Sequence, residues 1–146
     1  MAAPDFAFAW EHADSPNGPW GHLEVLWFHG HEEMSALYKY DLVVLAKNPN
    51  ADVDLQKMIG SRATLRIRTF SDPAYRLVHG VIVEAEDVAP IPDGQVYRIT
   101  LMPPIVRADH RQRSRLFLDK TIRRIIDAVV TNDPHYARVD GLSADP

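Results

Sequence analysis

Strict alternation of apolar and polar side chains is the feature that most constrains how this chain can fold. Residues 62–70 read RATLRIRTF, in which Ala63, Leu65 and Ile67 alternate with arginine and threonine. Because successive side chains of a β-strand point to opposite faces, this period of two predicts a strand with one buried and one basic face. Alternation or a run of β-branched residues also predicts strands at 5–10, 22–28, 37–45, 75–88 and 95–102.

Turn-forming residues separate the predicted strands. Proline, asparagine, aspartate and glycine cluster at 15–21, 48–52, 71–74 and 90–94, and these residues favour turns. The segment FHGHEEMS at 28–35 is also expected to be a connection, and Gly80 is expected to introduce a bulge or a bend. Short strands joined in this way predict a mainly β fold: an antiparallel β-barrel of about six strands, or a sandwich, with helical additions.

A short helix is predicted between the third and fourth strands, over residues 54–60. Asp54 suits the N-cap, Val53 and Met58 suit a hydrophobic staple, and Gly60 suits the position after the last turn. The segment is long enough for one to two helical turns.

A second, amphipathic helix is predicted near the C-terminus, with Asp119 as its N-cap. Its apolar residues recur at the spacing of one helix face, and they are Ile122, Ile125, Ile126, Val129 and Val130. We expect this stripe to pack in the core, where the helix would cover one face of the barrel. If the stripe is exposed, it is a candidate groove for a partner.

The 146 residues suffice for one domain with a substantial core. We expect an N-terminal strand and loop at 1–22, a barrel domain with its terminal helix at 23–131, and a tail at 132–146 that starts a further region.

The formal net charge of −4 argues against a nucleic-acid or anionic-membrane partner. No cysteine is present, so the chain has neither disulfides nor thiolate metal ligands. The N-terminal residues lack the basic region of a signal peptide, and no apolar run approaches the ~20 residues of a membrane helix. We therefore expect no membrane insertion by this segment.

The sequence contains few candidates for catalysis or metal binding. His29 and His31 would share one face if they lay on a strand, but Gly30 and the following Glu32 and Glu33 favour a solvated turn. A zinc site also needs three or four ligands. Neither a G-x-S-x-G elbow nor a phosphate-binding glycine loop is present. We expect no catalytic residue, no metal and no cofactor, and hence no enzyme.

Two groups of arginines are candidate interface residues. The first lies on one predicted strand face and the second lies in RADHRQRSR at 107–115; together they are Arg62, Arg66, Arg68, Arg107, Arg111, Arg113 and Arg115. Clustered cations create a local positive field that suits an acidic partner. The alternative is a solvated strand face for the first group and a flexible connector for the second.

Five segments in order carry a family resemblance. They are FHGHEEMSALYKYDL at 28–42, DLQKMIGSRATLRI at 54–67, YRLVHGVIVEAE at 75–86, YRITLMP at 97–103 and RLFLDKTIRRIIDAVV at 115–130. This series resembles the N-terminal region of the type VI secretion spike proteins called VgrG and of the related phage late-control and baseplate hub proteins. Two departures are the replacement of a tryptophan-rich stretch by IVRADHRQRS, and Leu118-Asp119 where a Phe-Gln type pair is common.

The resemblance implies a structural hub of a contractile injection system. In that family, two similar barrels per chain build a pseudo-sixfold ring in a homotrimer, between the inner tube and the puncturing spike. The implied partners are copies of the chain, the inner tube and baseplate proteins, and a spike tip or effector held by domains beyond residue 146. The resemblance also implies assembly in the cytoplasm and export by the apparatus without a signal peptide.

Two other functions remain open from the residues alone. One is a ligand-binding β-barrel that uses Trp10, Trp20 and Trp27, together with the tyrosines, as a stacking platform. The other is a small enzyme with a histidine and carboxylate metal site.

Overall fold

The computed structural model describes residues 5–13, 18–47, 53–69, 71–109 and 116–131. The chain divides into two units, Met1–Val106 and Arg107–Pro146, and each is treated separately below.

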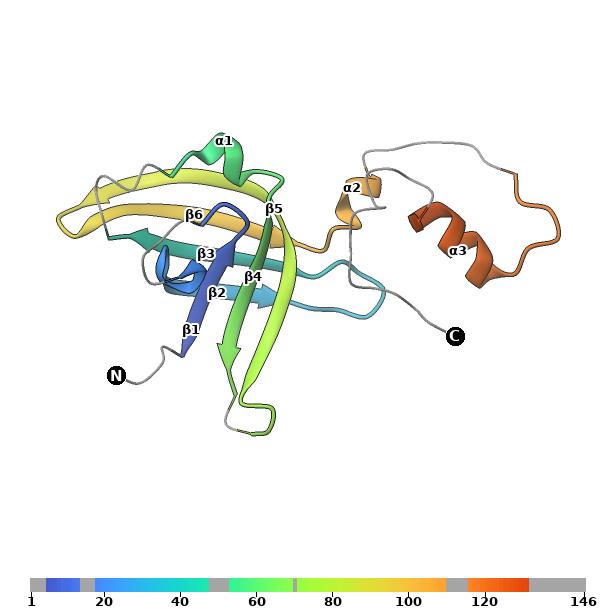
Figure 1. The fold of residues 1–146 in the computed structure, drawn as a ribbon, viewed down its shortest axis with the longest axis horizontal. Coiled ribbons are helices and arrows are strands. Elements are labelled where there is room, and N and C mark those ends of the chain that lie inside the picture. The colour runs from blue at the N-terminus through green and yellow to red at the C-terminus, as the bar shows by residue number, and fades with distance from the viewer. Residues whose placement is uncertain (1–4, 14–17, 48–52, 70, 110–115, 132–146) are drawn as a thin grey trace. The chain divides into compact units, whose positions relative to one another are not determined.

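The first unit is built on one antiparallel sheet (Figure 1). Its strands are β1 (Phe6–Trp10), β2 (Glu24–His31), β3 (Lys39–Ala46), β4 (Arg62–Arg68), β5 (Tyr75–Ile91) and β6 (Gly94–Met102). The sheet has six strands in the order β1-β4-β5-β6-β3-β2. An isolated bridge between Phe8 and Leu23 brings its two edges together, so the sheet curls on itself. The predicted mainly β fold, with about six antiparallel strands, is confirmed.

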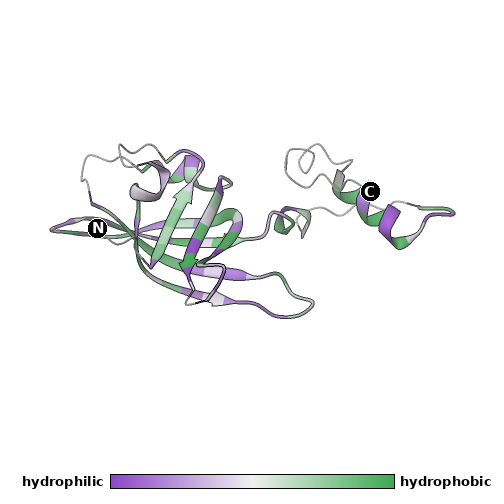
Figure 2. Ribbon diagram, turned by 60° about the horizontal axis from the view of Figure 1, so that its bottom comes forward, coloured by the Kyte–Doolittle hydropathy of each residue, from purple (hydrophilic) through white to green (hydrophobic). Residues whose placement is uncertain are grey.

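The inner face of the curled sheet forms the core. Leu42, Leu65, Ile99 and Leu101 come from three different strands, β3, β4 and β6, and each is 0% exposed. Burying a side chain of this size stabilises a fold by about 1.5–3 kcal/mol. Hydrophobic and hydrophilic residues alternate along the strands (Figure 2), as the period of two requires.

The helix α1 (Leu55–Met58) lies between β3 and β4. The Asp54 side chain accepts hydrogen bonds from the backbone N–H groups of Gln56 and Lys57, at 3.0 and 3.3 Å. Gly60 has φ +84°, a backbone conformation that glycine adopts without strain. Val53 and Met58 are both buried in the core cluster. The predicted capping residues are therefore confirmed.

Strand β5 bulges further along its length than at Gly80, where the bulge was expected. The register of β5 against β6 shifts between Ile82 and Glu84 and again between Asp87 and Ala89. At Gly80, β5 instead runs close to β6: a Cβ atom there would lie 2.5 Å from the Met102 carbonyl oxygen. The glycine is needed for this close approach.

The helix α3 (Ile122–Thr131) lies in the second unit and follows the short helix α2 (Val106–Asp109). The predicted N-cap at Asp119 is wrong. The Thr121 side-chain oxygen accepts from the Arg124 N–H at 3.4 Å, and the Thr121 carbonyl accepts from the Ile125 N–H at 3.0 Å. A threonine side-chain oxygen can cap a helix in the same way as an aspartate carboxylate. Thr121 directly precedes the first turn of α3.

The apolar stripe of α3 is exposed in the described part of the second unit. Ile122 is 78% exposed, Ile126 is 55% exposed and Val129 is 42% exposed. Periodicity reveals which face of a helix is apolar but not what covers it, so the expectation that α3 covers one face of the barrel stays a prediction. None of the helices in the described ranges is long and apolar enough to span a membrane.

Replacing Gly80 with alanine is expected to lower the free energy of unfolding by about 1–3 kcal/mol, because the added methyl overpacks β5 against a backbone carbonyl. Urea unfolding followed by tryptophan fluorescence measures this change. An unchanged or higher midpoint would contradict the close approach of β5 and β6.

Candidate interaction surface

The arginine row of β4 lies on the outer face of the sheet. Arg62, Arg66 and Arg68 alternate with Ala63 and Leu65, which are 5% and 0% exposed. The three arginine side chains therefore lie on the face opposite the core, where the alternation placed them.

Strand β1 places two carboxylates beside this row. Arg68 Nη1 lies 3.2 Å from Asp5 Oδ1, and Glu11 Oε2 accepts the backbone N–H of Arg62 at 3.3 Å. An exposed ion pair of this kind contributes about 0.2–1 kcal/mol. The row is thus less positive than its sequence indicates, because part of its charge is compensated within the sheet.

Arg66 has a different environment from Arg68. Its guanidinium carbon lies 4.8 Å from the ring centroid of Trp20 and 4.8 Å from that of Tyr75. Trp20 belongs to the short helix η1 (Pro19–Gly21), and Tyr75 is the first residue of β5. The Nε atom of Arg66 is buried without a hydrogen-bond partner among the described residues. The sequence alone does not reveal this cluster, because Trp20 lies far from Arg66 and Tyr75 along the chain.

The second arginine group is only partly described. Arg107 lies exposed in α2. Arg111, Arg113 and Arg115 lie outside the described residues.

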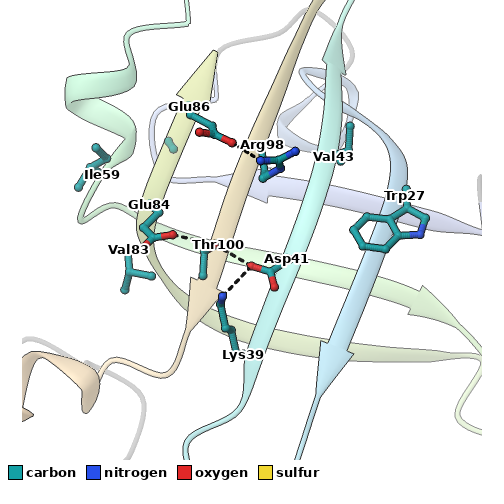
Figure 3. Close-up of a pocket in the computed structure, with 11 residues that line it drawn as sticks. Trp27, Lys39, Asp41, Val43, Ile59, Val83, Glu84, Glu86, Arg98 and Thr100 are labelled. Atoms are coloured by element: carbon teal, nitrogen blue, oxygen red, sulfur yellow. Dashed lines mark hydrogen bonds and ion pairs between the residues drawn. The ribbon is translucent and has the colours of Figure 1, made fainter. Parts of the chain in front are cut away.

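A hollow of about 760 Å³ lies on the outer face of β2, β3, β6 and β5 (Figure 3). Two cross-strand rows of register partners form its floor. The first is Trp27, Val43, Arg98 and Glu86, and the second is Asp41, Thr100 and Glu84. Trp27 at one side is 55% exposed, and Ile59 after α1 is 46% exposed. The hollow thus combines apolar groups with charged ones.

The charged groups of the hollow bind one another across the strands. Thr100 Oγ1 donates to Asp41 Oδ1 at 2.8 Å, and Lys39 Nζ lies 3.2 Å from the same oxygen. Arg98 and Glu86 form an ion pair at 2.5 Å (Figure 3). Such cross-strand pairs stabilise a sheet. The arrangement suits a polar contact surface better than acid-base catalysis, since most of its carboxylates already have partners.

The histidine pair lies on a strand, which makes the predicted turn wrong. Strand β2 continues through Gly30 to His31, with Gly30 opposite Tyr40. A Cβ atom at position 30 would overlap the Tyr40 ring, so glycine lets the ring lie against the strand. Both histidines are exposed. No group of three or more His, Cys, Asp or Glu side chains that could hold a metal occurs within the described ranges.

Glu32 ties the β2–β3 connection to β5. Its carboxylate accepts a hydrogen bond from the Tyr40 hydroxyl at 2.7 Å and forms an ion pair with Arg76. Nearby, the Tyr38 hydroxyl donates to the His79 carbonyl. The hydrogen bond from Arg76 lowers the pKa of Glu32, whereas burial, followed by the bond to Glu32, raises the pKa of Tyr40 to about 12. Glu32 is therefore not the freely solvated turn carboxylate that was predicted.

The three tryptophans do not form one stacking platform. Trp10 is 6% exposed, and its indole N–H donates to His22 Nδ1 at 3.0 Å. Trp20 lies beside Arg66, whereas Trp27 lies at the hollow, on a different part of the outer face.

Comparison with known proteins decides the family. A model of the phage tail baseplate hub (GPD) family matches residues 31–144. The chain belongs to this family. The baseplate hub chain is also 27% identical, over 119 residues, to the type VI secretion system spike protein VgrG1a of Pseudomonas aeruginosa. That match covers 82% of this chain and 18% of the relative.

A solved structure has the same fold as the baseplate hub chain. It is the E. coli c3393 protein, described as a component of the type VI secretion system with structural similarity to the T4 tail proteins gp27 and gp5. The TM-score is 0.68 at 17% identity, over 87% of this chain and 32% of that one. The chain therefore spans under a third of the length of both proteins. The predicted resemblance to VgrG and baseplate hub proteins is confirmed.

The structure gives physical roles to residues on which the resemblance depended. Gly30 accommodates Tyr40, Arg76 holds Glu32, and Gly80 permits the approach of β5 to β6. These contacts set the shape of the hub sheet rather than a reaction centre.

Replacing Glu32 with glutamine tests the tie to Arg76. The pKa of Glu32 is lowered from its ordinary value of 4.5, so the carboxylate contributes stability above about that pH, and the contribution is lost as the pH falls further. Because the side chain is 42% exposed, solvent screening limits the effect to about 0.5–1 kcal/mol. Urea unfolding at pH 7 should show this loss, and unfolding at a pH below 4.5 should show a smaller one.

The matched control is Glu33→Gln. Glu33 is adjacent and exposed, and among the described residues its carboxylate pairs with His31 alone, at 3.3 Å. Its replacement should change stability little at either pH. Equal effects of the two substitutions would show that the Glu32 contacts have no special role.

Proposed function

We propose that this chain is a structural hub segment of a contractile injection system, in the spike and baseplate assembly that links the inner tube to the puncturing spike. The observation that supports this proposal most strongly is the match of the baseplate hub family model over residues 31–144. The similarity to VgrG1a and the shared fold with c3393 support the same assignment.

A scaffold role without catalysis is part of this proposal. It is supported by the family match to hub and spike proteins. It is also consistent with the pairing of charged side chains across strands, as in Arg98 with Glu86 and Arg76 with Glu32. The first pair joins β6 to β5 and the second fixes the β2–β3 connection to β5, as suits a part under mechanical load.

We further propose that the full-length protein assembles as a homotrimer that contacts the inner tube and other baseplate proteins, with a spike tip or effector held through its further regions. Residues 23–131 would supply the hub domain, between an N-terminal strand and loop at 1–22 and a following region from 132. Assembly would occur in the cytoplasm, followed by export through the apparatus without a signal peptide. The arginines of β4 and of residues 107–115 are the proposed contact residues.

The test uses the native full-length protein in its own cell. Deleting its gene should abolish release of the inner tube protein into the medium, and the intact gene should restore it. Cryo-microscopy of the purified apparatus should show the protein between the tube and the spike. Normal tube release after deletion, with no density for the protein in the apparatus, would refute the proposal.

A further inference from the structure

Three arginines of the sheet form ion pairs, and Arg66 differs from them. Arg68 pairs with Asp5, Arg76 pairs with Glu32 and Arg98 pairs with Glu86. The Arg66 guanidinium contacts two aromatic rings and forms no hydrogen bond or ion pair with a described residue.

The guanidinium of Arg66 has N–H donors that no acceptor in the described residues occupies. Its buried Nε has lost water without gaining an acceptor, which destabilises a buried donor. The contacts with two aromatic rings offset part of this cost. These contacts stabilise the position of the charge, but they provide no acceptor for the N–H groups.

The two rings also limit how the Arg66 side chain can move. Trp20 comes from η1, which packs against β1, and Tyr75 comes from β5; these two strands are the neighbours of β4 on either side. The terminal nitrogens of Arg66 are not among the buried atoms without a partner, so they keep access to solvent. A restrained guanidinium with accessible terminal donors is preorganised for a carboxylate, whose two oxygens match its fork.

An apolar group lies beside the arginine. Leu77 is the register partner of Arg66 on β5, so the two side chains share the outer face. Leu77 is 49% exposed. The surface therefore offers one cation next to one exposed apolar side chain.

We propose that Arg66 receives an aspartate or glutamate side chain of a partner protein, and that Leu77 contacts an apolar residue next to that acid. The inference rests on the proposed assembly role, because it needs a partner that presents the acid. It goes further by naming Arg66 as the receptor and a carboxylate as the group it binds. The net charge of −4 disfavours the alternative anion, a nucleic-acid phosphate.

The experiment is an NMR titration of the uniformly ¹⁵N-labelled chain, following the Arg66 Nε–H and the Trp20 indole N–H. The probes are the capped peptides acetyl-Ala-Glu-Leu-Ala-amide and acetyl-Ala-Gln-Leu-Ala-amide, and inorganic phosphate. The glutamate peptide should shift both signals saturably, with a Kd of about 1 mM or tighter. The glutamine peptide and phosphate should bind at least about tenfold more weakly, since they lack the charge or the planar fork.

Two variants separate a specific receptor from general charge. Arg66→Lys keeps the charge but loses the fork, so affinity for the glutamate peptide, read at Trp20, should fall about tenfold. Arg123→Lys, at an exposed position of α3, should leave affinity within about twofold. Thermal unfolding of each variant checks that the fold is retained, and Leu77→Ser should weaken binding without altering the Arg66 ring contacts.

Equal binding of the glutamate and glutamine peptides, equal binding of phosphate, or equal losses in the two lysine variants would each overturn the inference. None of these results would bear on tube release or on the place of the protein in the apparatus. Conversely, absence from the apparatus would refute the hub role and leave the peptide result standing.

Discussion

Burial of one face of a single sheet is the constraint on which the first unit depends. No second sheet covers the inner face within the described residues, so that face becomes dry only because the sheet curls and its own side chains meet. The bridge between Phe8 and Leu23 brings the edge strands together. Gly80 lets β5 pass close to β6 where β5 exchanges one neighbouring strand for the other. Side chains on the opposite face are consequently directed to solvent.

The outer face shows how a sheet can carry many charges without losing stability. Asp41 binds both Thr100 and Lys39, and Glu86 binds Arg98. Each interaction contributes little alone, but each keeps a charge close to an opposite one across neighbouring strands. Arg66 departs from this pattern, because rings rather than a carboxylate surround it. A local departure of this kind in a folded domain is a reason to look for a partner.

Side-chain interactions also fix the connection between β2 and β3. Glu32 and Tyr38 attach it to β5 by side-chain bonds to Arg76 and to a backbone carbonyl. Attachment of a loop at two points reduces its freedom without adding to the core. In a segment of a baseplate hub protein, such ties favour one fixed shape, which suits the structural role proposed above.

The sequence by itself determined where the strands lie, to within a few residues at their ends, and the caps of α1, because each depends on residues within a few positions of one another. It also carried the family resemblance. Only the tertiary structure decided that β2 continues through Gly30, that Glu32 binds Arg76, that the α3 stripe is exposed, and that Trp20 and Tyr75 flank Arg66. The physical reason is that these features join residues far apart in the chain, or depend on what covers a surface. Both follow from the strand order β1-β4-β5-β6-β3-β2 and the curl of the sheet, which local periodicity does not encode.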